Sequence, residues 1–139
     1  MSNALESRTK DRQTSRLTSR THNRKSYPLT INDETSKQRI LSALADPYSR
    51  RIMSGTTQKP LSALELSEKY EIPKSTTYRR IEELTQSQLL VAVKPSRTKN
   101  GKWFEVYRCL VTRIGISSRN GALLIGIANH RQSKYQKCS

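Results

Sequence analysis

The chain has 139 residues, with 26 Lys and Arg against 11 Asp and Glu and a formal net charge of +15. This length has room for one folded domain with tails, which excludes large two-domain enzymes. No stretch approaches the roughly 18 consecutive apolar residues of a membrane span, and the N-terminus lacks the apolar core of a secretory signal. We therefore expect a soluble, strongly basic cytoplasmic protein without membrane contact.

Cysteine and histidine are too sparse to suggest a metal centre. Cys109 and Cys138 have no histidine nearby, whereas a structural zinc site needs about four ligands. In a reducing compartment we expect free thiols, with Cys109 a small strand residue and Cys138 in a tail. His22 and His130 lie in polar segments. Because paired carboxylates, a nucleophile with its base and a phosphate-binding glycine loop are also lacking, we predict no enzyme, metal or cofactor.

Polar segments flank the region with apolar periodicity. Residues 1–34 hold seven basic and four acidic side chains with Ser and Thr between them, which predicts a disordered basic arm. Residues 129–139 form a second polar tail. Five arginines of the arm follow i, i+4 spacing, so a helical arm would line them on one face against a polyanion; a solubilising tail is the alternative. They are Arg8, Arg12, Arg16, Arg20 and Arg24.

Three helices are predicted in the first half of the folded region. Apolar positions share one helical face over residues 35–45, and Asp46-Pro47 then supplies an N-cap and a favoured first helical residue. A second helix is expected from Pro47 to about Ser54, and residues 55–60 have the composition of a loop. A third helix is predicted over Ser62–Tyr70.

The next segment has helix-turn-helix spacing. Only Glu71-Ile72-Pro73 separates the third helix from a new one over residues 74–84, whose apolar face carries Thr77, Ile81 and Leu84. In such a motif the start of the second helix enters the DNA major groove. An ordinary amphipathic surface helix with a basic end is the alternative. The predicted base contacts are Lys74, Ser75, Thr76, Tyr78, Arg79 and Arg80.

A β-hairpin follows, as in the wing of a winged helix. Residues 89–93 and 103–111 are rich in strand formers, and the basic loop 94–102 between them contains the turn dipeptide Asn100-Gly101. Pro95 interrupts the ladder, so the register stays open. We expect the loop to lie along the DNA backbone or minor groove. The predicted backbone contacts are Arg50, Arg51, Lys94, Arg97, Lys99 and Lys102.

A second hairpin is predicted over residues 112–128. With a two-residue turn at Asn120-Gly121, Ser118 pairs with Leu123, Ile116 with Ile125 and Ile114 with Ile127. An isolated hairpin is marginal, so its Ile face must pack on the wing sheet, the first helix or a second subunit. The last option predicts a homodimer. The isoleucines of this face are Ile114, Ile116, Ile125 and Ile127.

The sequence resembles the ArsR-like class of winged-helix transcriptional regulators, especially small archaeal members. The resemblance covers residues 38–109 and depends on LADPYSRRIM at 44–53, on ELS at 65–67 with PKSTTYRRIEEL at 73–84, and on GKWFEVY at 101–107. It implies a dimeric, sequence-specific DNA-binding regulator, with the helix on the bases and the wing on the backbone. The family's metal-sensing cysteine pair is absent from residues 62–70, and the hairpin replaces its usual final helix.

We therefore predict an α+β winged helix-turn-helix domain over residues 35–111, with three to four helices and an additional C-terminal hairpin. The expected function is sequence-specific transcription regulation on double-stranded DNA. One alternative is a winged helix that binds DNA or RNA without sequence preference, although few aromatics are available for stacking. Another is an adaptor of the transcription machinery that uses Ile125 and Ile127 as its contact surface. No motif supports a small-molecule effector.

Overall fold

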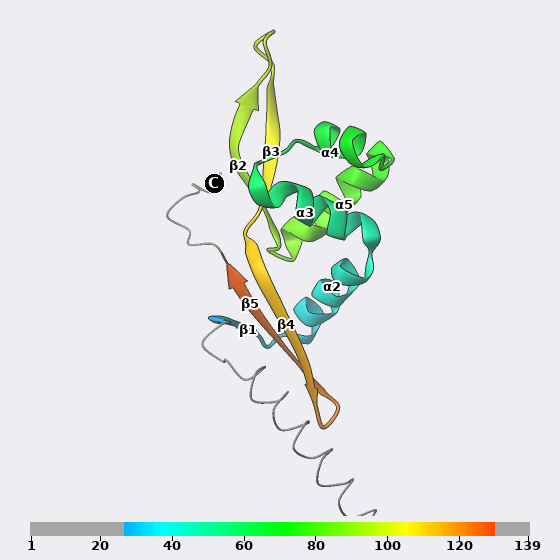
Figure 1. The fold of residues 1–139 in the computed structure, drawn as a ribbon, viewed down its shortest axis with the longest axis vertical. Helices are drawn as coiled ribbons and strands as arrows, with labels where there is room; N and C mark the ends of the chain where they lie inside the picture. The colour runs from blue at the N-terminus through cyan, green and yellow to red at the C-terminus, as the bar shows by residue number, and fades with distance from the viewer. Residues whose placement is uncertain (1–26, 130–139) are drawn as a thin grey trace, which may run out of the picture.

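The computed structural model describes residues 27–129, which form four helices and five strands (Figure 1). The helices are α2 (Glu34–Ala45), α3 (Pro47–Gln58), α4 (Ala63–Tyr70) and α5 (Lys74–Gln86). The strands are β1 (Leu29–Ile31), β2 (Leu90–Arg97), β3 (Trp103–Cys109), β4 (Val111–Arg119) and β5 (Ala122–Asn129). No described helix is long and apolar enough to span a bilayer. The arginines predicted for the arm, both histidines and Cys138 lie outside the described residues.

Side-chain caps determine where three of these helices begin. Asp33 and Asp46 each accept a backbone N–H at 2.7 Å at the start of α2 and α3. Pro47 occupies the first turn of α3, which confirms the predicted start signal. At α4, Ser62 and Glu65 form a reciprocal capping box. Each cap satisfies N–H groups that the helix itself leaves unpaired.

The predicted loop over residues 55–60 is wrong for its first four residues, because α3 continues to Gln58. Thr56 is fully buried and its hydroxyl donates to the carbonyl of Ile52 at 2.7 Å. Gly55 lies directly against the ring of Tyr70, where a β-carbon would not fit. Packing against α4 therefore keeps this segment helical, although its composition is typical of a loop.

The turn between α4 and α5 has the predicted three residues. Glu71 adopts a left-handed conformation with φ of 53°, which ends α4. The buried Ile72 then donates its N–H to the Ser67 carbonyl at 3.0 Å and accepts the Ser67 hydroxyl at 2.6 Å. Pro73 begins α5. This pair of reciprocal bonds holds the two helices in a helix-turn-helix.

The core lies between the helices and the inner faces of the strands, and along the chain it extends from α2 to β5. Residues from α2, α3, α4, α5, β2, β3, β4 and β5 form one buried cluster. Its largest fully buried apolar side chains are Ile40, Ile52, Leu66, Leu84, Leu89 and Ile125.

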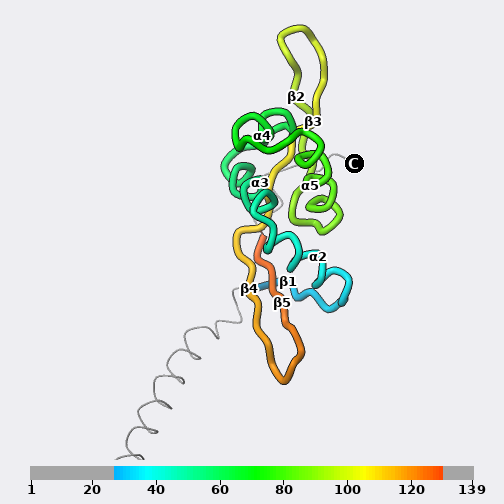
Figure 2. Tube along the Cα trace, turned by 90° about the vertical axis from the view of Figure 1, so that its right-hand side faces the viewer, coloured from blue at the N-terminus to red at the C-terminus, as the bar shows by residue number. Residues whose placement is uncertain are grey.

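β2 and β3 form the predicted hairpin wing, which extends beyond the helices at the end where α4 meets α5 (Figures 1 and 2). The register shifts between Val93 and Ser96, as expected from Pro95 in the strand. β2 runs further into the predicted loop, to Arg97, which pairs with Trp103 at the predicted start of the second strand. The tip is closed by the Thr98 N–H on the Lys102 carbonyl at 2.9 Å.

The second hairpin has the predicted register. Ile114 pairs with Ile127, Ile116 with Ile125, and Ser118 with Leu123, around a two-residue turn with positive φ at Asn120 and Gly121. Ile125 and Ile127 belong to the same core cluster as Ile40 of α2, so this face packs on the domain itself. Ile125 and Ile127 are therefore buried, so these two side chains are not the exposed contact surface that the adaptor hypothesis requires of them.

A short strand, β1, adds to this hairpin and gives a sheet of order β1-β5-β4. Leu29 pairs with Ile127 and Ile31 with Ile125. β1 and the start of α2 fall within residues 1–34, which were predicted to be a disordered arm. That prediction is wrong for residues 27–34, because β5 supplies backbone partners that the local sequence does not reveal.

Candidate nucleic-acid interface

The first two turns of α5 present donor and acceptor side chains on one exposed surface. Lys74, Ser75, Tyr78 and Arg79 are exposed, and Tyr78 retains 59% of its accessible surface. Thr76 is half-buried at the edge of this surface. On the opposite side of α5, a buried face packs on the core through Thr77, Ile81 and Leu84. The helical periodicity expected from the sequence therefore fixes which side chains point outward.

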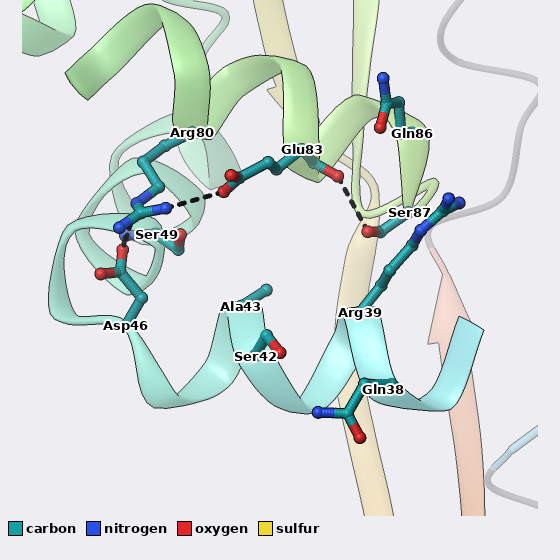
Figure 3. Close-up of a pocket in the computed structure, with 10 residues that line it drawn as sticks. All are labelled: Gln38, Arg39, Ser42, Ala43, Asp46, Ser49, Arg80, Glu83, Gln86 and Ser87. Atoms are coloured by element: carbon teal, nitrogen blue, oxygen red, sulfur yellow. Dashed lines mark hydrogen bonds and ion pairs between the residues drawn. The ribbon is translucent and has the colours of Figure 1, made fainter. Parts of the chain in front are cut away.

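Arg80 differs from its neighbours because two carboxylates hold its guanidinium group (Figure 3). Its Nε lies 3.0 Å from Oδ2 of Asp46, and one terminal nitrogen donates to Glu83 at 2.9 Å. The hydrogen bond to Glu83 and the negative charge of Asp46 raise the pKa of Arg80, although its burial acts in the opposite direction. Asp46 is also the N-cap of α3, so this ion pair joins the start of α3 to the middle of α5.

A cleft of about 430 Å³ lies beside this ion pair, between α2 and the second half of α5 (Figure 3). Its walls carry the Arg80 guanidinium, two carboxylates, and hydroxyl and amide groups. The sequence alone does not predict the cleft, because Asp46 is recognisable there only as a helix cap. The lining residues are Gln38, Arg39, Ser42, Ala43, Asp46, Ser49, Arg80, Glu83, Gln86 and Ser87.

The wing presents four basic side chains, and all of them are exposed: Lys94, Arg97, Lys99 and Lys102. Arg97 also stabilises the wing tip. Its Nε donates to the Gly101 carbonyl at 3.0 Å, and its guanidinium lies 5.4 Å from the centre of the Trp103 ring. Trp103 keeps 60% of its accessible surface. An exposed indole beside cationic groups is suited to a nucleic-acid surface, because it offers a stacking face.

Arg50 and Arg51 are exposed on α3, and each also has an internal contact. Arg50 donates to the Leu44 carbonyl at 2.6 Å, at the C-terminal end of α2, where positive charge is favourable. The Arg51 guanidinium lies 5.8 Å from the centre of the Tyr48 ring. Both residues therefore support the junction of α2 and α3, and both remain accessible from solvent.

Two titratable groups on β3 have raised pKa values. Burial raises the pKa of Tyr107, and the acceptor carboxylate of Glu105, which lies 2.6 Å from its hydroxyl, adds to the shift. Burial also raises the pKa of the Cys109 thiol, which is a buried strand residue as predicted. Among residues 27–129 no group of three or more His, Cys, Asp or Glu side chains could hold a metal ion.

Comparison with known proteins identifies the motif. Residues 44–93, from the end of α2 to the first half of β2, match the family model of a helix-turn-helix domain. This segment is therefore similar to a helix-turn-helix domain. Together with the hairpin β2-β3 and the additional C-terminal hairpin, this domain makes an α+β winged helix-turn-helix fold, as predicted.

Among solved structures, the chain is similar to NolR from Sinorhizobium fredii, with a TM-score of 0.43 and 19% sequence identity. The similarity covers 54% of this chain and 69% of that chain. No curated protein matches the sequence.

Proposed function

We propose that this protein is a sequence-specific transcription regulator that binds double-stranded DNA as a homodimer, in the manner of ArsR-like winged-helix regulators of the small archaeal type. In this proposal, α5 enters the major groove and the wing lies on the backbone or in the minor groove. The observation that carries it is the acid-free, exposed surface of Lys74, Ser75, Tyr78 and Arg79. Non-specific phosphate binding requires only positive charge, whereas this surface also offers neutral donors and acceptors that can distinguish base edges.

Within this proposal the two arginines of α5 have different roles. Arg79 is exposed and free to form a bidentate contact with guanine, which discriminates between bases by about 1–3 kcal/mol. We assign Arg80 a positioning role, because Asp46 and Glu83 already occupy its guanidinium. Thr76 would contact DNA from the edge of the surface. Arg50, Arg51, Lys94, Arg97, Lys99 and Lys102 would neutralise phosphates.

The test is a selection of binding sites from random duplex DNA, followed by affinity measurements with the selected site and with unselected duplex. We expect one motif to be enriched. Arg79→Ala should weaken binding to that motif about ten- to a hundredfold, with a much smaller effect on unselected duplex, because a base contact is lost. Arg39→Ala, at an exposed position of α2 outside the proposed DNA surface, is the matched control and should change neither affinity.

Two results would count against this proposal. If no motif is enriched, the protein is a non-specific DNA- or RNA-binding winged helix. If Arg79→Ala weakens both duplexes equally, Arg79 contacts phosphate and base readout lies elsewhere.

A further inference from the structure

We propose that the free edge of β4 pairs antiparallel with β4 of a second copy, with the two-fold axis at Gly115, and that this joined sheet is the dimer interface. The inference rests on the homodimer of the proposed function and specifies where its subunits meet. β4 has nine residues and, among the described elements, it pairs only with β5, so its other edge carries unpaired backbone groups. Such an edge is a template for another strand.

The other strand edges in residues 27–129 carry stronger features against pairing than the edge of β4 does, although β4 contains Arg113 and Arg119. β1 has only three residues and follows Pro28. β2 contains Lys94, Pro95 and a bulge. β3 is bridged at Tyr107 by Leu61. β4 has no proline, lysine or acidic residue, and its single irregularity lies between Val111 and Arg113 at one end. Among these strand edges, the edge of β4 has the fewest features that discourage pairing, so it is the one expected to pair with another strand.

The hairpin geometry determines which groups face this edge. Arg119 and Ala122 flank a two-residue turn with positive φ at both positions, so they form a hydrogen-bonded pair. Alternate residues toward Arg113 also bond to β5. The backbone N–H and carbonyl groups of Ile114 and Ile116 consequently point away from β5. Strand pairing around Gly115 would let Ile114 of each copy exchange hydrogen bonds with Ile116 of the other.

Side chains favour the same register. Ile116 is 44% exposed, and this pairing places it against Ile114 of the second copy, on the face that packs against the core. Arg113 then faces Ser117, and Arg119 lies opposite the irregular start of the second copy's β4, so no two arginines oppose each other. If the pairing of the two strands shifted by two residues toward the hairpin tip, Arg113 of one copy would lie opposite Arg119 of the other. Repulsion between these like charges disfavours that register. The segment Ile114-Gly115-Ile116 is symmetric about its centre, so a second copy of this chain is the partner that matches it.

This interface is compatible with DNA binding. The wing and the start of α5 lie at one end of the molecule, and the β4-β5 hairpin extends from the other end (Figures 1 and 2). Joining two copies at β4 would leave the exposed surface of α5 accessible in both copies. The two-fold axis would also predict an operator with inverted half-sites.

Disulfide trapping tests the register. Residues 113 and 117 of opposite copies would form a non-hydrogen-bonded pair, whose Cα separation of about 4.5 Å suits a disulfide. We would prepare full-length R113C and S117C, each in a C138S background to remove the tail thiol. A mixture of the two should cross-link rapidly under mild oxidation, whereas each variant alone should not. Cross-linking of either variant alone at the same rate, or of no sample although the chain is dimeric, would overturn the interface.

Sedimentation equilibrium provides a second measurement with a matched pair of variants. Ile116→Lys should raise the dimer dissociation constant about tenfold or more, because it removes an apolar contact and adds like charges. Leu124→Lys makes the same kind of change at a side chain of similar exposure, 46%, on the opposite face of the sheet, and should have little effect. Equal effects of both variants, or a wild-type chain that sediments as a monomer, would contradict the proposal. DNA-site selection is scored separately, so loss of the interface leaves the DNA-binding proposal standing.

Discussion

At the scale of single residues, Asp46 combines a cap and an ion pair. Its Oδ2 accepts the Ser49 N–H at 2.7 Å and lies 3.0 Å from Nε of Arg80. Partial burial alone would raise the pKa of Asp46, but the hydrogen bonds from Ser49 and the charge of Arg80 outweigh it and lower the pKa below 3.8. The carboxylate is thus favoured in the folded state. Its contribution to stability is complete above pH 3.8 and is lost as the pH falls through the lower folded value.

We therefore predict that Asp46→Ala lowers the free energy of unfolding by about 1–2 kcal/mol near neutral pH. The difference from wild type should shrink as the pH falls below about 4, because the wild-type carboxyl group then becomes protonated. Urea unfolding at both pH values measures this change. Asp46→Asn retains a capping oxygen but not the charge, so it should lose less. A difference that does not depend on pH would mean that the charge of Asp46 does not contribute.

At the scale of elements, the attachment of β1 depends on two glycines of the neighbouring sheet. Gly115 of β4 and Gly126 of β5 are paired, and the ring of Tyr27 covers both. A β-carbon at Gly126 would lie 2.7 Å from Cβ of Tyr27, and one at Gly115 would lie 2.6 Å from its Cζ. The guanidinium of Arg113 lies over this ring, 5.1 Å from its centre. The absence of two side chains therefore provides the space for the ring of Tyr27, two residues before β1.

Gly126→Ala should consequently lower the free energy of unfolding by about 1–3 kcal/mol, because Tyr27 must be displaced. In a Tyr27→Ala background the same change should be neutral or slightly stabilising, since glycine is otherwise unfavourable in a strand. A double-mutant cycle by chemical unfolding measures this coupling. Ser117→Ala, on an exposed residue of β4, serves as the control. Additive effects of the Tyr27 and Gly126 substitutions would show that the contact contributes nothing.

The elements that the sequence predicted are those with local signals. The register of the second hairpin follows from a turn dipeptide and a two-residue alternation, and α5 follows from its apolar period. β1 has no such signal, since three residues in a polar segment become a strand only because β5 lies beside them. Arg80 is a similar case in the candidate site. Its position on α5 was predictable, but its partner Asp46 lies between α2 and α3, far away in the sequence, so no local pattern indicates this ion pair.

At the scale of the whole molecule, the net charge of +15 is divided between base-reading and phosphate-neutralising roles in the proposed function. Each neutralised phosphate changes the slope of log affinity against log salt by about 0.9. Lys99 and Lys102 are exposed near the wing tip and make no ion pair within residues 27–129. Both are therefore available for phosphate contacts that carry no sequence information.

We predict that Lys99→Ala and Lys102→Ala each weaken binding to the selected site and to unselected duplex by the same factor, because both duplexes present the same phosphates. Each substitution should also reduce the salt slope by about 0.9, and the double variant by about twice as much. Anisotropy titrations with both duplexes over a range of salt concentrations provide all of these values. Arg79→Ala is the opposite control, since it should lower preference for the selected site with little change in slope. If a wing substitution changed sequence preference while leaving the slope unaltered, the wing would read bases, and the assignment of its lysines to phosphates would be wrong.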